Sequence, residues 1–402
     1  MVRFLLTLVV IIIGQFNSGA QKRNYFKPDP ELLNIINASL SRSASQYKIL
    51  IKTLPDSLFP RTFEKGTLMK SSSSAWISGF YPGTLLLLYE FNKNPEFKDA
   101  ALKKFEILKK EQFNAGTHDL GFMMYCSFGT AKIILKTNEY DTVLLNSAAS
   151  LSKRFHKPVG LIKSWDHKKE KWEYPVIIDN MMNLELLTWA TRTSKDSSFY
   201  KIAVSHADKT LNNHFRNDYS SYHVVDYDPK SGKVLKRITE QGYSDESSWA
   251  RGQAWGLYGY MMMYRETGDR KYLQQANHIA DFILNHPHLP KDKIPYWDFD
   301  AAGIPNVPRD VSAAAVICSA LIELSQYVDK RNSKIYLNAA AEMIRSMSSP
   351  DYFAEPGTNG GFVLKHSVGF MLAGTEVDVP LSYADYYYIE ALLRYKNLNI
   401  QK

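Results

Sequence analysis

Residues 249–285 read WARGQAWGLYGYMMMYRETGDRKYLQQANHIADFILN, and their composition changes at the short turn Thr267-Gly268. Before the turn, glycine, alanine, methionine and aromatic residues dominate and charges are few. After the turn, polar and charged side chains alternate with apolar ones at helical spacing. A helix of the first kind is buried on all sides, whereas a helix of the second kind exposes one face to water. The stretch therefore predicts an inner helix followed by an outer one.

Four other short turns have nearly the same form, and each opens a helix with an early aromatic residue. They are Lys93-Asn94-Pro95, Thr137-Asn138, Thr193-Ser194-Lys195 and Asp329-Lys330-Arg331. This self-similarity is a degenerate internal repeat. Apolar residues at three-to-four spacing predict twelve helices in all. Their ranges are 29–52, 76–92, 96–112, 118–136, 139–155, 179–192, 196–214, 249–266, 269–285, 310–328, 332–348 and 382–396.

The alternation of buried and water-facing helices predicts an all-α fold of two concentric rings with six helices each. An open helical solenoid would give the same alternation, so periodicity alone leaves that alternative open. Residues 215–248 carry two short apolar stretches around a glycine turn, which predicts a small β-hairpin within a long loop. If successive helices are antiparallel, every long loop and the N-terminus of every inner helix lie on one face, where we expect a single mouth.

Composition places the chain among globular proteins. It has 402 residues, of which 45% are hydrophobic and 22% charged. Residues 1–20 combine Arg3, an apolar run and small residues at the end, which is typical of a cleaved signal peptide of a periplasmic or secreted protein. A membrane anchor is the alternative, although the apolar run is short for a span. We expect residues 21–402 to form one catalytic domain without a membrane span.

The net charge of the chain and the absence of several known motifs narrow the classes of ligand and reaction that fit this sequence. Loss of Arg3 leaves 48 basic and 41 acidic residues, and the excess fits an anionic ligand. Cys126 and Cys318 are the two cysteines, so no disulfide framework is expected, and a single bridge between them is disfavoured. Metal-ligand spacings, a phosphate-binding loop and a serine-hydrolase motif are absent from the sequence. We expect no metal, no cofactor and no nucleic-acid partner.

Two carboxylates stand at predicted starts of inner helices. Asp119 and Asp179 could simply cap these helices, because aspartate is a common N-cap. Asp179, however, is flanked by Val176-Ile177-Ile178 and Met181-Met182, an apolar setting that raises a carboxyl pKa and suits a general acid. His118 adds a second titratable group beside Asp119. Both acids are expected to line the single mouth.

A candidate sugar-binding stripe lies on the helix predicted at 249–266. Arg251 and Trp255 are four residues apart and therefore share a helix face. A guanidinium beside an indole suits a sugar that carries a carboxylate, although an arginine packed among core aromatics would look the same. The predicted supporting residues are Trp76 and Trp165 as stacking surfaces, and His223 and Gln241 as hydrogen-bonding groups.

Five motifs together resemble the unsaturated glucuronyl hydrolases, glycoside hydrolase family 88. The resemblance extends from Trp76 to Arg394, and the Arg-Gly-Gln-Ala-Trp string is its most specific part. It implies an (α/α)6 barrel, with Asp179 as general acid/base and Asp119 as its assisting carboxylate. It also implies sugar contacts from His223, Gln241, Arg251 and Trp255, and more loosely from Trp76, Trp165 and His118. The motifs are His118-Asp119-Leu120-Gly121-Phe122, Asp179-Asn180-Met181-Met182-Asn183-Leu184, Gln241-Gly242-Tyr243, Trp249-Ala250-Arg251-Gly252-Gln253-Ala254-Trp255-Gly256 and Ala384-Asp385-Tyr386-Tyr387.

The resemblance implies removal of a 4,5-unsaturated uronate from oligosaccharides made by polysaccharide lyases. The family hydrates the C4=C5 enol ether, after which the sugar opens and releases its neighbour. Glycosaminoglycan- and ulvan-type oligosaccharides are the expected partners, and sulfate tolerance is expected to depend on long loops such as 360–375. Two alternatives stay open: an unsaturated rhamnogalacturonyl hydrolase acting on pectin fragments, and a non-catalytic binder of anionic glycans.

Overall fold

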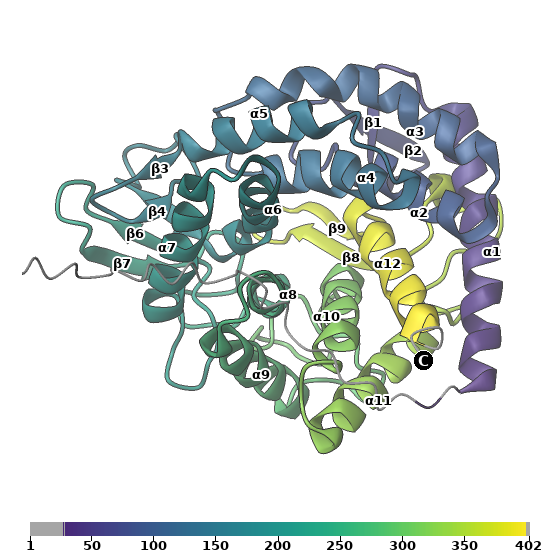
Figure 1. Ribbon diagram of the computed structural model, residues 1–402. Coiled ribbons are helices and arrows are strands. Elements are labelled where there is room, and N and C mark those ends of the chain that lie inside the picture. The colour runs from purple at the N-terminus through teal and green to yellow at the C-terminus, as the bar shows by residue number, and fades with distance from the viewer. Residues whose placement is uncertain (1–26, 28, 399–402) are drawn as a thin grey trace, which may run out of the picture.

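A computed structural model describes residues 27 and 29–398, and the predicted signal peptide at residues 1–20 lies outside them. The described residues contain twelve α-helices, as the sequence predicts (Figure 1). The helices are α1 Pro30–Thr53, α2 Phe80–Asn92, α3 Pro95–Leu108, α4 Thr130–Leu135, α5 Asp141–Ser152, α6 Leu184–Ser194, α7 Ser197–Asn213, α8 Ala250–Thr267, α9 Arg270–Asn285, α10 Val311–Leu324, α11 Lys330–Met347 and α12 Ser382–Leu398.

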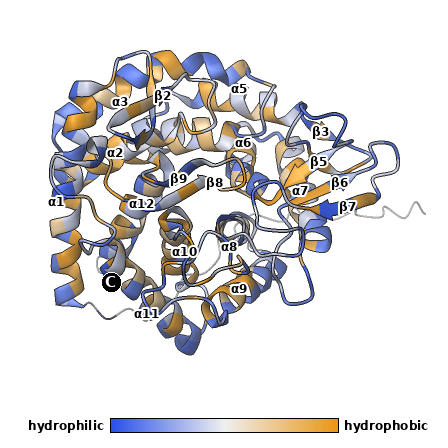
Figure 2. Cartoon of the chain, turned by 180° about the vertical axis from the view of Figure 1, so that it is seen from behind, coloured by the Kyte–Doolittle hydropathy of each residue, from blue (hydrophilic) through white to orange (hydrophobic). Residues whose placement is uncertain are grey.

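The even-numbered helices form a closed inner ring. Neighbouring inner helices pack together around the ring, with α6 packing against the π-helical turn Gly121–Gly129 that leads into α4. Because α12 packs against α2, the ring has no open end (Figure 1). The odd-numbered helices surround it. Every residue of α10 is buried, whereas the outer helix α9 buries one face and turns polar residues outward (Figure 2). The structure therefore confirms the two concentric rings of an (α/α)6 barrel, and closure excludes the open solenoid.

The repeated short turns share one physical device. Lys93, Lys195 and Gly268 end their inner helices in the left-handed conformation, with φ of 55°, 65° and 72°. The next residue is Asn94, Asp196 or Asp269, and its side chain accepts a backbone N–H from the first turn of the outer helix. A left-handed C-cap followed at once by an N-cap reverses the chain in the fewest residues.

Three inner helices begin differently from the prediction. The helix expected at 76–92 becomes regular only at Phe80, and the one expected at 118–136 starts as the π-helix Gly121–Gly129 (η2) before α4. The helix expected at 179–192 starts with the 3-10 turn Ile178–Asn183 (η3) before α6. These irregular turns lie where the inner helices enter the barrel, and π-helical turns are frequent at functional sites.

The described residues also form four small antiparallel sheets in the loops of the barrel. The predicted hairpin is confirmed as β6 and β7, and it gains a third strand, β5, before η3. This three-stranded sheet projects beyond α7, whereas β8 and β9 cross the centre of the ring in the view of Figure 1. The other pairs were not predicted, because their strands lack a clear alternation. The strands are β1 Phe59–Glu64, β2 Thr67–Ser71, β3 Phe155–His156, β4 Leu161–Ile162, β5 Pro175–Ile177, β6 Val224–Tyr227, β7 Val234–Ile238, β8 Ser367–Phe370 and β9 Thr375–Val379.

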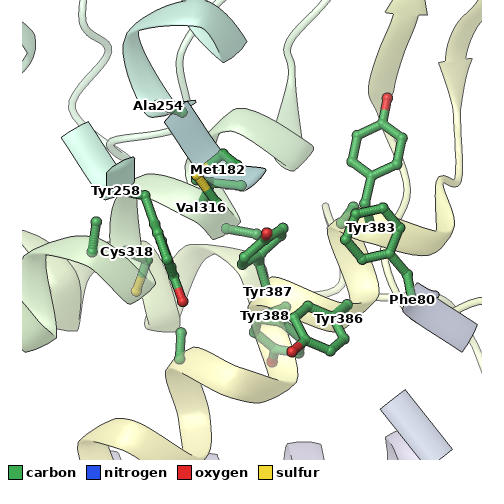
Figure 3. Packing of buried hydrophobic residues seen from close by; sticks show 14 of the residues in the cluster. Phe80, Met182, Ala254, Tyr258, Val316, Cys318, Tyr383, Tyr386, Tyr387 and Tyr388 are labelled. Atoms are coloured by element: carbon green, nitrogen blue, oxygen red, sulfur yellow. The ribbon is translucent and has the colours of Figure 1, made fainter. Parts of the chain in front are cut away.

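Aromatic rings fill the centre of the barrel (Figure 3). The ring of Tyr387 on α12 lies 5.6 Å from Trp255 and 5.5 Å from Tyr258, in edge-to-face geometry that favours aromatic pairs. Cys126 and Cys318 are both free. Among the described residues, none of the helices has the length and apolar character needed to cross a bilayer.

A glycine fixes how closely the two irregular turns approach each other. A Cβ on Gly121 in η2 would overlap the backbone of Asn183 in η3. We predict that Gly121→Ala lowers the free energy of unfolding by about 1–3 kcal/mol, because the overlapping atoms are backbone and cannot move aside cheaply. Urea denaturation measures this change.

Gly256→Ala is the matched control in α8, because the nearest atoms to a Cβ there are at 3.5 Å, an ordinary contact distance. Alanine favours a helix over glycine, so this variant should be neutral or more stable by up to about 1 kcal/mol. Equal destabilisation by both substitutions would contradict the proposed constraint at Gly121.

Candidate active site

Seven of the nine predicted site residues line one cavity of about 110 Å³ at the N-terminal ends of the inner helices. Phe122 and Ile177 complete its wall. Asp119 and Asp179, which are sixty residues apart in the chain, therefore share one cavity. Within the described residues, no group of three histidines, cysteines or carboxylates is arranged to hold a metal ion. The seven are Trp76, His118, Asp119, Trp165, Asp179, Gln241 and Arg251.

Asp179 is positioned by the sheet that precedes it. Strand β5 ends at Ile177, and Ile178 donates its backbone N–H to the carbonyl of His223 at 3.1 Å. Asp179 then begins η3 and is only 9% exposed. Burial raises the pKa of its carboxyl from the usual 3.8 to about 6, Asp119 adds to the increase, and Arg251 and His118 oppose it. A carboxyl with this pKa holds its proton well into the mildly acidic range.

His223 faces Asp179 as a neutral hydrogen-bond donor. Its Nδ1 accepts the backbone N–H groups of Glu240 and Gln241 at 3.0 and 3.1 Å, which assigns the ring proton to Nε2. Burial, reinforced by the charges of Arg251 and Lys171, lowers the pKa of His223 to about 3. Nε2 lies 4.0 Å from Asp179 Oδ2, too far for a hydrogen bond, and neither atom has a hydrogen-bond partner among the described residues. His223 does not itself line the cavity.

Asp119 is held by its two neighbours in the chain. Thr117 donates its hydroxyl to Asp119 Oδ2 at 2.9 Å. His118 Nε2 lies 3.1 Å from Asp119 Oδ1, within ion-pair distance but without the angle of a hydrogen bond. Burial alone would lower the pKa of His118, yet the adjacent Asp119 and the carbonyl of Ser164 raise it. The Asp119 carboxylate therefore lies beside the His118 imidazole, whose protonated, positively charged form it stabilises.

Arg154 ties together the loops around Asp119, a role that no sequence pattern indicates. Its guanidinium donates to the carbonyls of Ala115, Lys163 and Ser164 at 2.9, 2.8 and 3.2 Å. Ser164 O is also 2.8 Å from His118 Nδ1. Arg154 was assigned to the end of the helix predicted at 139–155, where a lone arginine looks like surface.

Arg251 holds the β8 strand. Its Nη1 donates to Val368 O and, at 3.1 Å, to Asp310 Oδ2, while Nη2 donates to Gly369 O at 2.7 Å. Asp310 was predicted only as a helix start, because nothing in the sequence links it to a residue 59 positions away. Both Nη groups of Arg251 already donate to acceptors in the protein. The pairing of Arg251 with a sugar carboxylate therefore stays a prediction.

Arg251 has a different indole neighbour from the one that helical spacing predicts. The indole beside the Arg251 guanidinium is Trp249, with 4.5 Å between the guanidinium carbon and the ring. Trp255 is 0% exposed and packs 5.0 Å from Phe122, a residue of the cavity wall. Contact of Trp255 with a sugar stays a prediction.

The remaining three predicted residues form walls of the cavity. Gln241 donates to Gly369 O at 3.1 Å, which joins the loop after β7 to the β8 strand. Trp165 lies 6.1 Å from the His223 ring, and Trp76 lies 5.4 Å from Phe122. The cavity therefore combines a protonatable buried acid, a second carboxylate and two indoles, which is a suitable environment for acid–base chemistry on a sugar ring.

Known proteins with similar sequences and structures decide the family. A protein of Formosa agariphila named unsaturated glucuronyl hydrolase is 44% identical over 343 residues, or 85% of each chain. The chain belongs to the unsaturated glucuronyl hydrolases. A crystal structure of an unsaturated glucuronyl hydrolase specific for heparin matches with a TM-score of 0.89 at 46% identity, covering 91% of this chain and 98% of that one.

A more distant member carries a bound sugar. It is an Asp-to-Asn mutant of the Streptococcus agalactiae unsaturated glucuronyl hydrolase complexed with dGlcA-GalNAc6S, with a TM-score of 0.77 and 30% identity over 89% of this chain and 90% of that one. No family model matches the chain. Membership makes the protein a glycoside hydrolase and does not favour the rhamnogalacturonyl or the non-catalytic alternative.

The raised pKa of Asp179 predicts an inverse pH dependence of stability. The folded-state pKa of about 6 exceeds the usual 3.8, so the native state binds more protons between these values and loses stability as the pH rises through them. Asp179→Asn removes this penalty. We expect the variant to be more stable than the parent by on the order of 2–3 kcal/mol at pH 7, and to lose that advantage near pH 4.

Urea denaturation at both pH values measures the difference. Asp196→Asn is the control, because Asp196 is an exposed N-cap that asparagine can replace. Equal stability of Asp179→Asn and the parent at pH 7 would contradict the burial of an ionised Asp179.

Proposed function

We propose that the enzyme hydrates the C4=C5 enol ether of an unsaturated uronate at the non-reducing end of glycosaminoglycan-derived oligosaccharides, with Asp179 as general acid and base. The observation that carries this proposal is a buried carboxyl with a pKa of about 6 in the same cavity as a second carboxylate. A general acid works best when its pKa is near the working pH.

The reaction has three steps. The Asp179 carboxyl donates its proton to C4 of the ring, which leaves positive charge shared between C5 and the ring oxygen. The resulting carboxylate then takes a proton from water as the water oxygen bonds to C5. Asp179 is then protonated again. The hemiketal at C5 opens as the bond from C5 to the ring oxygen breaks, which gives a ketone at C5 and a hydroxyl group on C1. The hemiacetal at C1 then becomes an aldehyde and releases the next sugar, which keeps the glycosidic oxygen as its hydroxyl group. Because no displacement occurs at C1, the carboxylate-separation rule for ordinary glycosidases does not apply.

The other residues have supporting roles in this proposal. Asp119, anchored by Thr117, places negative charge near the developing cation and raises the proton affinity of Asp179. The neutral His223 directs Nε2–H toward Asp179 and favours its carboxylate after proton transfer. Trp165, Trp76 and Gln241 supply walls against which a uronate ring packs.

The net charge of the chain and the ligands of its relatives support a class of polysaccharide as the source of the substrate. The chain has a net charge of +8, and the relatives described above are specific for heparin or bind dGlcA-GalNAc6S. We assign sulfated or unsulfated glycosaminoglycan fragments as substrates, with ulvan fragments as the comparison in a substrate panel. The predicted signal at residues 1–20 supports a periplasmic or secreted location.

Asp179→Asn should leave a folded protein with activity lowered by about 10²–10⁴-fold, the usual contribution of a general acid–base group. Loss of ultraviolet absorbance of the conjugated double bond in an unsaturated disaccharide measures the reaction. The surface control Asp196→Asn should keep parental activity. Retention of more than about a tenth of activity by Asp179→Asn would remove Asp179 from the proposed role.

The pH profile of the parent enzyme gives an independent check. Protonated Asp179 is the reactive form, so kcat/KM should fall about tenfold per pH unit above a midpoint near 6. An increase in kcat/KM between pH 6 and pH 8 would contradict protonation by Asp179.

A further inference from the structure

We propose that Lys168, Lys171 and Lys236, the rim lysines, form a subsite for an acidic substituent of the substrate beyond the uronate in the cavity. The substituent is a sulfate ester or a carboxylate. This inference rests on the proposed function, because it concerns the part of the same substrate that extends past the rim.

The rim lysines converge on one place. Lys168 and Lys171 both pair with Glu240, which is 12% exposed on its side chain. Lys236 donates to the backbone carbonyl of Lys171. The ammonium groups of Lys171 and Lys236 lie 4.6 and 5.3 Å from the ring of Trp172, so one buried indole orients both. These contacts fix three cations whose side chains remain 39–46% exposed.

The three rim lysines carry more positive charge than the carboxylates of Glu240 and Asp226 beside them neutralise. Glu240 faces two ammonium groups, and each ammonium has three N–H donors, of which an ion pair uses one or two. The carboxylate of Asp226, 3.9 Å from Lys236, already accepts the backbone N–H groups of Glu173 and Tyr174. Residues 153–174 and 224–240 together hold eleven basic and six acidic residues, so this protruding region carries most of the excess charge of the chain.

The cluster adjoins the cavity. Glu240 precedes Gln241, a cavity-lining residue, and both backbone N–H groups bind His223. Trp165 lines the cavity, and its ring lies 5.8 Å from that of Trp172, the indole that Lys171 and Lys236 contact, so two neighbouring indoles connect the cavity to the rim lysines. A sugar chain that leaves the cavity on this side meets the rim lysines first.

A matched control exists on the same sheet. Lys157, Lys230 and Lys233 are exposed. The register places Val224 opposite Ile238 near the cavity and Tyr227 opposite Val234 at the far end, next to the turn that holds Lys230 and Lys233. A Cβ on Gly232 would meet the carbonyl of Pro158, so Lys157 shares this far end. Removing these tip lysines changes the net charge as much as removing the rim lysines.

The test compares two triple variants, K168Q/K171Q/K236Q at the rim and K157Q/K230Q/K233Q at the tip. The substrates are an unsulfated unsaturated disaccharide, its sulfated counterparts and an unsulfated tetrasaccharide that carries a second uronate. We expect the rim variant to lose tenfold or more in kcat/KM on at least one acid-bearing substrate, and less at high salt. Its kcat/KM on the unsulfated disaccharide should stay within twofold, as should every value for the tip variant.

The affected substrate identifies the acidic group: a sulfated disaccharide indicates the sulfate, and the tetrasaccharide indicates the carboxylate. Equal losses on all substrates, no loss on any, or the same losses in the tip variant overturn the subsite. So does a parent enzyme that refuses every acid-bearing substrate. If the rim variant does not fold, the single variant K168Q takes its place in the same comparison, because Lys168 is the most exposed of the three lysines. Failure of the parent on the unsulfated disaccharide would instead count against the proposed function.

Discussion

The close contact between η2 and η3 is the constraint on which the site depends. Gly121 lies against the backbone of Asn183, and the Asn183 side chain accepts the N–H of Phe122 at 3.0 Å. The two turns therefore enter the barrel side by side, which brings Asp119 and Asp179 to one cavity. Any side chain larger than hydrogen at Gly121 would force these turns apart.

Burial of Asp179 then determines the chemistry. Closure of the inner ring supplies an aromatic floor, and two arginines fasten the loops above it: Arg251 holds β8, and Arg154 holds the segments before Asp119 and after β4. An acid enclosed in this way keeps its proton at a pH where an exposed aspartate would be ionised. The barrel thus provides both the proximity of the two acids and the burial that raises the pKa of Asp179.

The sequence predicts those features that have a local cause. The inner and outer rings follow from composition and from short turns that combine a left-handed C-cap with an N-cap, and the two acids follow from their places at helix starts. Contacts between segments that are far apart in the chain produce no local sequence pattern and were not predicted. Asp310 and Arg154 looked like an ordinary cap and a surface residue, and the β1–β2 and β8–β9 hairpins depend on pairing against the barrel. Helical spacing predicts that Trp255 shares a face with Arg251 but gives no depth, and the Trp255 side chain is fully buried.

Burial keeps Asp179 protonated up to a pH of about 6. Carboxyl ¹³C NMR of the labelled enzyme, with the Asp179 resonance assigned by its absence from Asp179→Asn, measures that titration directly. We expect a midpoint near 6 for this one resonance. A midpoint below about 4, the value of an ordinary exposed aspartate, would contradict it.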